Sequence, residues 1–268
     1  MQLPPPSASE PETSTFQSVV FVQTDLLAIA THPDDIELHV SGTLMKTADQ
    51  GGSFALCDLT RGERGTRGSA ELRSLETEGA NRILGISSEN RWNLGIPDGD
   101  VRITEATILS IVRAIRYFRP RILLLPSERD RHPDHENAHR LIREAWFNSG
   151  LTALETEHEG ASQKPHRPEL LLTFAHSWEF EPDFIVDITD QFERKIEAIA
   201  AYGSQFTIPG KTSAEELNQP STFISGEEFI EYLTARMRRW GFMIGTKYGE
   251  GFGKLGGPLK VNDVRHLL

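Results

Sequence analysis

The sequence predicts an α/β fold in which a mostly parallel β-sheet is covered by helices on both faces. Short apolar runs alternate with segments of helical periodicity through about residue 150, as in sheets built from strand–helix–strand units. The runs are bounded by Pro, Gly and charged residues, which is typical of buried strands. The length of 268 residues, with 38% hydrophobic and 25% charged residues, fits a globular domain with a substantial core.

The N-terminal half of the chain carries the clearest pattern. Residues 1–23 are rich in Pro, Ser, Thr and Glu, so we expect a flexible tail before a single domain of residues 24–268. Ser69 is a good helix N-cap, and Gly85 and Pro120 mark the ends of two helices. The apolar runs and helical spacings predict strands at 26–30, 53–59, 91–94 and 121–125, and helices at 36–50, 69–84, 104–118 and 136–148.

The C-terminal half is less regular. Apolar runs predict two more strands, at 169–174 and 184–188. We expect one helix from a cap at Thr189-Asp190 through Tyr202, and a long helix over 227–241. Three stretches lack a regular pattern and should be irregular, namely 150–168, 203–225 and the glycine-rich 249–254.

The charge and composition of the chain limit its partners. The 28 basic and 39 acidic residues give a net charge of −11, so we expect no binding to nucleic acid or to an anionic membrane. The single cysteine, Cys57, lies in an apolar run, and this usage suits a reducing cytoplasm. No apolar run approaches the roughly 18 residues of a membrane helix, and residues 1–7 do not resemble a signal peptide. We therefore expect a cytoplasmic protein.

Two clusters of histidine and aspartate follow predicted strands. The first, His32-Pro33-Asp34-Asp35, comes after strand 26–30, and the second, Arg131-His132-Pro133-Asp134-His135, comes after strand 121–125. Open α/β sheets keep their active sites just beyond the carboxyl ends of strands, so the clusters can meet. His32, Asp35 and His135 are the best candidates for metal ligands. Two histidines and one carboxylate with an open position are typical of catalytic zinc, although ferrous iron uses the same set.

The remaining side chains of the clusters suit the chemistry of hydrolysis. Asp34 lies between two expected ligands and could take the proton of an attacking water molecule. His132 could stabilise the developing oxyanion and donate a proton to the leaving amine. Asp134 could pair with His132 and keep that imidazole protonated.

Simpler interpretations remain open for each of these residues. A single His-x-x-Asp pair is weak evidence for a metal site, and Asp134 is equally well placed to cap the following helix. Spacing alone does not single out His135 as the third ligand. The other histidines are further candidates, namely His39, His139, His158, His166, His176 and His266.

Arginines near the second strand could recognise an anionic substrate. Arg61 and Arg64 lie in a Gly- and Arg-rich loop over 61–68, and Arg73 lies one turn into the next helix. Guanidinium groups bind carboxylate and phosphate well, but a solvated loop and an exposed helix arginine would look the same. The chain has no Gly-x-x-x-x-Gly-Lys-Ser/Thr pattern and no Gly-x-Ser-x-Gly pattern, so neither a P-loop nor an α/β-hydrolase elbow is expected.

At these residues the sequence resembles the LmbE/PIG-L family of zinc-dependent N-acetylglucosaminide deacetylases. Residues 31–35 and 132–135 match the two signatures of that family, and the likeness covers nearly the whole chain from residue 24. It is closest to the bacillithiol-biosynthesis branch, the N-acetylglucosaminyl-malate deacetylases. The supporting stretches are 57–63, 71–73, 93–98, 128–131, 201–206 and 248–252.

The resemblance implies a Rossmann-like fold and assigns the same roles to the site residues. His32, Asp35 and His135 match the metal ligands and Asp34 matches the general base. His132 matches the acid or oxyanion-stabilising histidine, with Asp134 tuning it, and Arg73 matches a substrate-binding arginine. Relatives are often homo-oligomers, including hexamers. The sequence departs from the family at His39 and Ser41, which replace small glycines and put the shape of the pocket in question.

The resulting expectation is a zinc enzyme that removes acetate from a small N-acetylglucosamine conjugate, with N-acetylglucosaminyl malate as the expected substrate. Arg73, Arg61 and Arg64 would recognise the acidic aglycone. One alternative is a related enzyme acting on another N-acyl glycoside, a chitooligosaccharide or a thiol conjugate. A second alternative, of another class, is a catalytically inactive sugar-binding module that keeps the fold.

Overall fold

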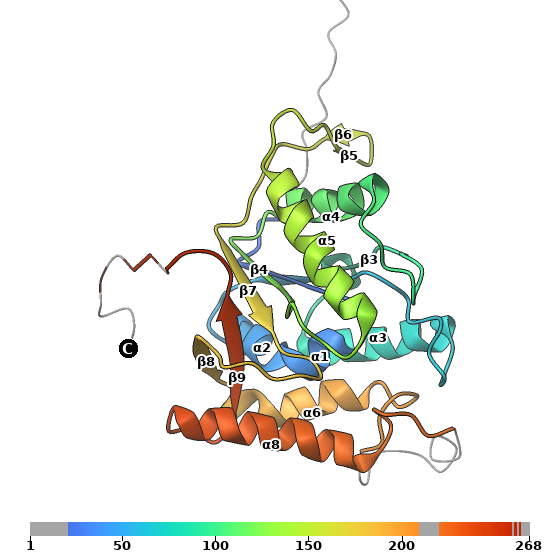
Figure 1. The fold of residues 1–268 in the computed structure, drawn as a ribbon, viewed down its shortest axis with the longest axis vertical. Helices are drawn as coiled ribbons and strands as arrows, with labels where there is room; N and C mark the ends of the chain where they lie inside the picture. The colour runs from blue at the N-terminus through green and yellow to red at the C-terminus, as the bar shows by residue number, and fades with distance from the viewer. Residues whose placement is uncertain (1–20, 209–219, 259, 262, 264–268) are drawn as a thin grey trace, which may run out of the picture.

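The protein is built on a mostly parallel β-sheet with helices on both faces (Figure 1). The computed structural model describes residues 21–208, 220–258, 260–261 and 263, so most of the expected tail 1–23 and part of the expected loop 203–225 lie outside the described residues. Seven strands of the described chain form one sheet in the order β3-β2-β1-β4-β7-β9-β8. Their bounds are β1 Leu26–Ala30, β2 Phe54–Asp58, β3 Arg91–Asn93, β4 Ile122–Pro126, β7 Leu170–Phe174, β8 Phe184–Asp187 and β9 Gly249–Lys254. A separate hairpin joins β5 (Glu157–His158) and β6 (Ala161–Ser162).

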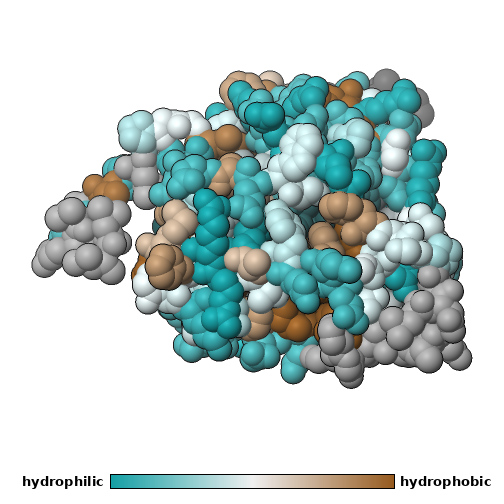
Figure 2. Space-filling model, turned by 60° about the horizontal axis from the view of Figure 1, so that its bottom comes forward, coloured by the Kyte–Doolittle hydropathy of each residue, from teal (hydrophilic) through white to brown (hydrophobic). Residues whose placement is uncertain are grey.

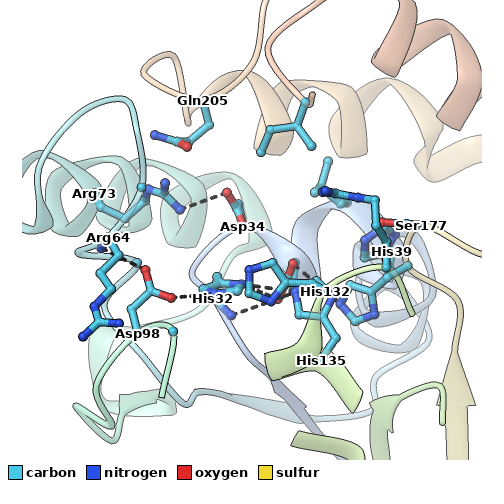
Figure 3. Close-up of a pocket in the computed structure, with 18 of the residues that line it drawn as sticks. His32, Asp34, His39, Arg64, Arg73, Asp98, His132, His135, Ser177 and Gln205 are labelled. Carbon is cyan, nitrogen blue, oxygen red and sulfur yellow. Dashed lines mark hydrogen bonds and ion pairs between the residues drawn. The ribbon is translucent and has the colours of Figure 1, made fainter. Parts of the chain in front are cut away.

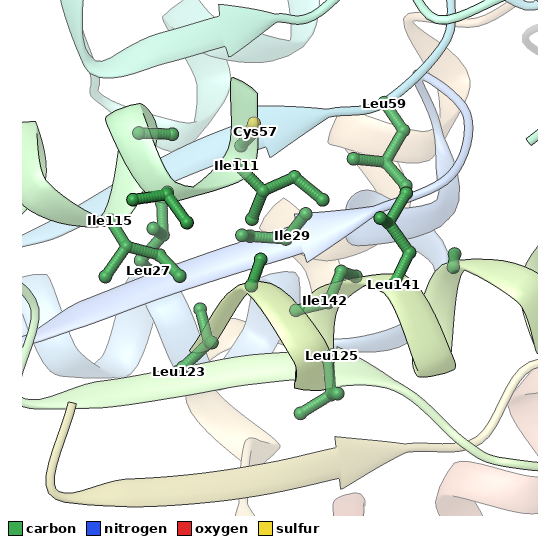
Figure 4. Packing of buried hydrophobic residues seen from close by; sticks show 14 of the residues in the cluster. Leu27, Ile29, Cys57, Leu59, Ile111, Ile115, Leu123, Leu125, Leu141 and Ile142 are labelled. Atoms are coloured by element: carbon green, nitrogen blue, oxygen red, sulfur yellow. The ribbon is translucent and has the colours of Figure 1, made fainter. Parts of the chain in front are cut away.

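Apolar clusters attach the helices to both faces of the sheet. On one face, Ile111 and Leu141 belong to a cluster with Leu27, Ile29 and Leu125 of the strands (Figure 4). Burial of each such side chain contributes on the order of 1.5–3 kcal/mol. Helices α4 and α5 cover this face, α1, α2, α3 and α6 cover the other, and α8 packs outside α6. The helix bounds are α1 Asp35–His39, α2 Ser41–Asp49, α3 Ala70–Leu84, α4 Glu105–Phe118, α5 Pro133–Ser149, α6 Phe192–Ala200 and α8 Glu227–Met243, with short 3₁₀ turns at Ser88–Asn90 and Thr189–Gln191.

The sheet order brings the two histidine clusters together. Strands β2, β1, β4 and β7 are parallel neighbours, so their carboxyl ends lie along one edge. The chain places β2 and β3 on one side of β1, and β4 and β7 on its other side. Because the chain adds strands first on one side of β1 and then on the other, the loops after β1 and β4 leave in opposite directions and a crevice forms between them. The first cluster follows β1 and the second follows β4, so both lie at this crevice.

The predicted elements are largely confirmed, with shifts at their ends. As expected, the Ser69 side chain caps α3, and Gly85 ends that helix in the left-handed conformation with a φ of 77°. The predicted start of α5 at residue 136 is wrong, because α5 begins at Pro133. Proline suits the first position of a helix, and the preceding His132 acts as N-cap. His135 therefore lies in the first turn of a rigid helix and not in a loop.

The predicted continuous helix over 36–50 is wrong, because it divides at Val40 into α1 and α2. The Glu250 carboxylate of β9 accepts hydrogen bonds from the backbone amides of Gly42 and Thr43, at 3.0 and 2.7 Å. A carboxylate at this position accepts hydrogen bonds from amides that begin a new helix. Its negative charge also interacts favourably with the positive end of the helix dipole. Local sequence could not reveal the division, since Glu250 is 208 residues away from Gly42.

The expectation of an irregular segment over 249–254 is also wrong, because these residues form β9, antiparallel to β7 and β8. Glycine weakens strands, so the alternating glycines concealed this one. Packing against α8 leaves no room for a side chain at Gly251, because a Cβ there would lie 2.9 Å from the Trp240 ring. Glu250 and Phe252 of β9 are buried.

Figure 2 shows the molecule with the bottom of Figure 1 turned toward the viewer. This face is mostly hydrophilic, with separate hydrophobic patches. Within the described part of the chain, no helix is both long and apolar enough to cross a membrane. These observations agree with the acidic, charged composition of the sequence.

Candidate active site

The loop between β1 and α1 holds Asp34 in a strained backbone conformation. Its φ of 123° and ψ of −30° lie in the positive-φ region that L-residues rarely adopt. Such strain costs on the order of 1–3 kcal/mol and is typical of active sites, where the surrounding structure enforces it. The turn brings His32, Asp34 and Asp35 to the wall of one cavity (Figure 3).

The atoms expected to bind a metal form a small triangle. His32 Nδ1 lies 3.2 Å from His135 Nε2 and 3.5 Å from Asp35 Oδ2, and the third side, from His135 Nε2 to Asp35 Oδ2, is 3.6 Å. Ligand atoms about 2.1 Å from a tetrahedral ion are about 3.4 Å apart. The three side chains therefore fit one dication with little movement. His132 and His176 complete further groups of possible ligand atoms around the same residues.

Two further carboxylates orient the histidines of this triangle. Asp98 Oδ1 lies 3.0 Å from His32 Nε2, and Asp130 Oδ1 lies 2.9 Å from His135 Nδ1. A carboxylate on the far nitrogen fixes the proton there, so the nitrogens that face each other keep their lone pairs for a cation. Asp130 also accepts hydrogen bonds from the backbone amides of His132 and Ser177, at 2.9 and 2.8 Å. It therefore ties the loop after β4 to the segment after β7.

The electrostatics of His32 favour a cation at this position. Although burial disfavours the imidazolium, hydrogen bonds to Asp35 and Asp98 outweigh it and raise the pKa of His32 to about 10. The same carboxylates would favour a dication that replaces the proton. Burial opposes ionisation of Asp35 as well, yet His135 and His176 hold its pKa well below the usual range. Asp35 is therefore ionised at neutral pH, and the three side chains together attract a cation.

Asp34 is paired with Arg73. The Arg73 Nη1 atom donates to Asp34 Oδ2 at 2.9 Å and to the Pro33 carbonyl at 2.8 Å. Burial raises the pKa of Asp34 to about 8, against the lowering effect of Arg73 and His32. A carboxyl group whose pKa lies near neutrality can both accept and return a proton, which is the property of a general base. Arg73 therefore orients this carboxylate as well as lining the cavity.

His132 faces the same cavity with a defined tautomer. Its Nδ1 accepts a hydrogen bond from the backbone amide of Asp134 at 3.2 Å, so the neutral ring carries its proton on Nε2. Burial and the neighbouring imidazoles lower the pKa of His132, so it is neutral at pH 7. The Asp134 carboxylate accepts hydrogen bonds from the amides of Gly99 and Val101, at 2.7 and 3.4 Å. It holds the turn after β3, and this contact differs from the expected pairing with the His132 ring.

The expected substrate-binding arginines divide between two cavities. Arg64 and Arg73 line the cavity at the histidines, which has a volume of about 250 Å³, together with Arg131. Arg61 lines a neighbouring cavity of about 240 Å³, which shares Arg73. Arg131 was not among the expected binding residues, and its guanidinium lies 4.3 Å from the centre of the Phe223 ring.

The two residues at which the sequence departs from the expected family pattern, His39 and Ser41, lie in different surroundings. His39 lines the cavity, and its Nδ1 accepts a hydrogen bond from Arg236 at 2.9 Å. Burial lowers the pKa of His39 well below its usual value, so this imidazole is neutral. Ser41 begins α2, and its Oγ donates to the Glu37 carbonyl at 2.8 Å. His39 is therefore the residue of the two that shapes the pocket.

A buried ionic cluster supports the loop from behind. Arg91 of β3 donates to Glu37 of α1 at 2.5 Å and to Asp58 of β2 at 2.8 Å, and all three side chains are at most 2% exposed. The Tyr202 hydroxyl donates to Glu37 at 3.2 Å. Glu37 lies two residues after the expected ligand Asp35, so the cluster fixes α1 to the sheet beneath the site.

Sequence reasoning missed Asp98 and Asp130 as parts of the site, and it named His176 only as one of six further histidine candidates. Asp98 and Asp130 orient histidines from loops after β3 and β4, and both lie in stretches that carried the family likeness. Acidic residues beyond strand ends are a usable signal for such partners. His176 follows β7, the neighbour of β4, and only the strand order shows that it reaches the histidines.

Comparison with known proteins settles the family. The family model described as GlcNAc-PI de-N-acetylase, PIG-L, matches residues 27–146. A diacetylchitobiose deacetylase of Thermococcus kodakarensis is 30% identical over 237 residues, covering 84% of this chain and 81% of that protein. The chain belongs to the PIG-L family.

Other relatives extend the comparison. The crystal structure of the conserved protein TT1542 from Thermus thermophilus is similar with a TM-score of 0.76 and 36% identity, covering 89% of this chain and 98% of that chain. A 4-oxalmesaconate hydratase of Pseudomonas putida is 26% identical over 220 residues, covering 74% of this chain and 81% of that protein. This PIG-L fold therefore occurs with more than one chemistry, and the reaction must be argued from the site.

Proposed function

We propose that this PIG-L protein is a zinc-dependent deacetylase that hydrolyses the acetamide of an N-acetylglucosamine-type substrate. The observation that carries the proposal is the triangle of His32, Asp35 and His135, with the Asp34 carboxylate beside it in one cavity. A cation site with an open position and an adjacent base are the parts that amide hydrolysis requires. The 30% identity to a diacetylchitobiose deacetylase supports the same reaction.

The side chains of the chain itself have distinct tasks in this reaction. His32, Asp35 and His135 would hold the ion, which supplies Lewis-acid activation of a water molecule and of the acyl oxygen. Asp34 accepts the proton of the water molecule as it attacks the acetyl carbonyl. His132, neutral and protonated on Nε2, donates a hydrogen bond to the oxygen that becomes negatively charged. Asp34 then returns its proton to the leaving nitrogen. The second proton of the water molecule passes from the new carboxylic acid to the amine, so the products are acetate and the protonated amine.

An acidic aglycone suits the cavity better than a neutral one. Arg64 and Arg131 line the cavity in addition to Arg73, which is paired with Asp34. Arginine binds carboxylates in a bidentate geometry, so these two side chains would favour a substrate that carries acid groups. N-acetylglucosaminyl malate, the substrate class of the bacillithiol branch, has this property.

Release of acetate from a set of substrates tests the proposal. The set contains N-acetylglucosaminyl malate, N,N′-diacetylchitobiose and 4-oxalmesaconate, with zinc supplied in each assay. We expect acetate release to be fastest with the malate conjugate, and Arg131→Ala to raise its KM without changing that for diacetylchitobiose. The exposed Arg102→Ala serves as a matched control. A preference for diacetylchitobiose would reject the acidic aglycone, and hydration of 4-oxalmesaconate without acetate release would reject the deacetylase.

A further inference from the structure

His176 is a buried imidazole that the reaction just described does not use. It follows β7, and its side chain is 1% exposed. Neither of its ring nitrogens makes a hydrogen bond with any described residue. Burial lowers the pKa of His176, so the ring is neutral at pH 7 and carries one N–H donor and one acceptor. An unsatisfied buried polar group costs about 1–3 kcal/mol, so its position calls for a partner.

The nearest charged group that can satisfy His176 is the carboxylate of Asp35. Asp35 presents Oδ2 to His32 and His135, and the same oxygen accepts the His32 backbone amide at 2.8 Å. The other oxygen, Oδ1, lies 3.6 Å from His176 Nε2. This separation is only slightly longer than a hydrogen bond, and a small rotation of the carboxylate closes it. Oδ2 of Asp35 therefore points toward the other expected ligands, whereas Oδ1 points toward His176.

The surroundings of His176 hold it in place. Its ring centre lies 4.2 Å from that of His135, 4.4 Å from that of His39 and 5.0 Å from that of Phe174. Arg236 donates to the His176 backbone carbonyl and, through its other Nη atom, to His39. Rings on three sides and a fixed backbone leave His176 little freedom to turn away from Asp35. Rigid placement of this kind is what an outer-shell partner of a metal ligand requires.

A second cation beside His176 is a poorer explanation. His135 Nε2 already faces His32 Nδ1, so it cannot serve a separate ion. The other nearby imidazole, His39, presents its Nδ1 to the guanidinium of Arg236. That guanidinium would repel a further cation, and only Asp35 Oδ1 and His176 would remain as ligands.

We propose that His176 is a positioning residue whose Nε2–H binds Asp35 Oδ1 and thereby keeps Asp35 as a one-oxygen ligand through Oδ2. Without this donor, the Asp35 carboxylate could rotate, so that Oδ2 would no longer be held beside His32 and His135 and the ligand set would bind the ion less tightly. The proposal rests on the proposed metal site of His32, Asp35 and His135. It adds a residue from a different strand to that site.

Zinc affinity of single variants tests the role of His176, measured by competition with a chromophoric chelator. His176→Leu removes the donor and should weaken zinc binding by about 10–100-fold. His176→Gln should restore most of the affinity, because the Gln Nε2 amide can occupy the position of the imidazole Nε2–H. His139→Leu is the matched control, because His139 is also a buried histidine but bonds to the Pro126 carbonyl at 2.8 Å.

Cobalt substitution separates an outer partner from a direct ligand. We expect the visible absorption bands of bound Co²⁺ to keep their positions in His176→Gln, since the inner ligands stay the same. Unchanged zinc affinity in His176→Leu would overturn the proposal, and so would a His176→Gln cobalt spectrum that shows the loss of a nitrogen ligand. His135→Ala tests the proposed function separately: if that variant kept full zinc affinity, the metal site itself would be wrong.

Discussion

The buried ionic cluster behind the site allows a prediction with a defined magnitude. Arg91 and Arg102 each form an ion pair of 2.5 Å, but the Arg91 and Glu37 side chains are 2% and 0% exposed, whereas those of Arg102 and Asp100 are 73% and 41% exposed. Arg91→Met leaves Glu37 and Asp58 buried without their cation, and breaking such a cluster costs about 3–5 kcal/mol. An exposed pair contributes at most about 1 kcal/mol, so Arg102→Met is the matched control.

Thermal unfolding measures this difference. For a chain of 268 residues, an entropy of unfolding of about 2.1 cal/mol/K per residue converts the loss to a fall in Tm of about 5–9 °C for Arg91→Met. Arg102→Met should lower Tm by less than about 2 °C. Equal shifts in the two variants would refute the reasoning, because they would show that burial does not set the strength of the pair.

The deficit of Arg91→Met should also depend on pH. Burial already raises the pKa of Asp58 against the lowering effect of Arg91, and removal of the guanidinium raises it further. An acid whose pKa is higher in the folded state loses stability as pH rises toward that pKa. The deficit should therefore be larger at pH 8 than at pH 5, and a deficit that grows on acidification would contradict this assignment.

Three further predictions concern the site itself. Asp34→Asn keeps the side-chain shape and tolerates the positive φ, so it should retain zinc while kcat falls by about 10²–10⁴-fold; an unchanged kcat would exclude Asp34 as the base. Asp98→Asn should weaken zinc binding by about 10–100-fold because His32 loses its anionic partner, whereas Asp100→Asn should leave it unchanged in the same chelator competition. Zinc binding must displace the proton of His32, whose pKa is raised to about 10, so apparent affinity should rise about tenfold per pH unit between pH 6 and 8; a flat profile would show that His32 is not a ligand.

Local signals in the sequence were sufficient for much of the fold and for the centre of the site. The alternation of apolar runs and capped helices predicted the strands β1, β2, β3, β4, β7 and β8 because each run reports burial directly. Two Pro-containing His/Asp motifs after β1 and β4 pointed to His32, Asp35 and His135, which the structure brings within 3.6 Å of one another. Parallel strands made this proximity foreseeable, since the carboxyl ends of neighbouring strands share an edge.

What the sequence could not supply depends on contacts between distant segments. The division between α1 and α2 requires a carboxylate from β9, and the glycines of β9 fit because Trp240 of α8 lies against them. His176 reaches the site only because β7 lies next to β4. The hydrogen bonds of Asp134 to Gly99 and Val101 likewise depend on where two loops meet. None of these has a periodic or local pattern to predict it.

The contact between Glu250 and the start of α2 has a consequence for how the protein folds during synthesis. The amides of Gly42 and Thr43 receive their partner only after the ribosome has added residues some two hundred positions later. Lys195, which binds Glu250 at 2.8 Å and the Glu37 carbonyl at 2.9 Å, joins the same late step. Contacts of such long sequence separation form slowly, and N-terminal segments emerge first during synthesis. A nascent chain that stops short of β9 therefore leaves the first amides of α2 without their carboxylate and Lys195 without its ion-pair partner.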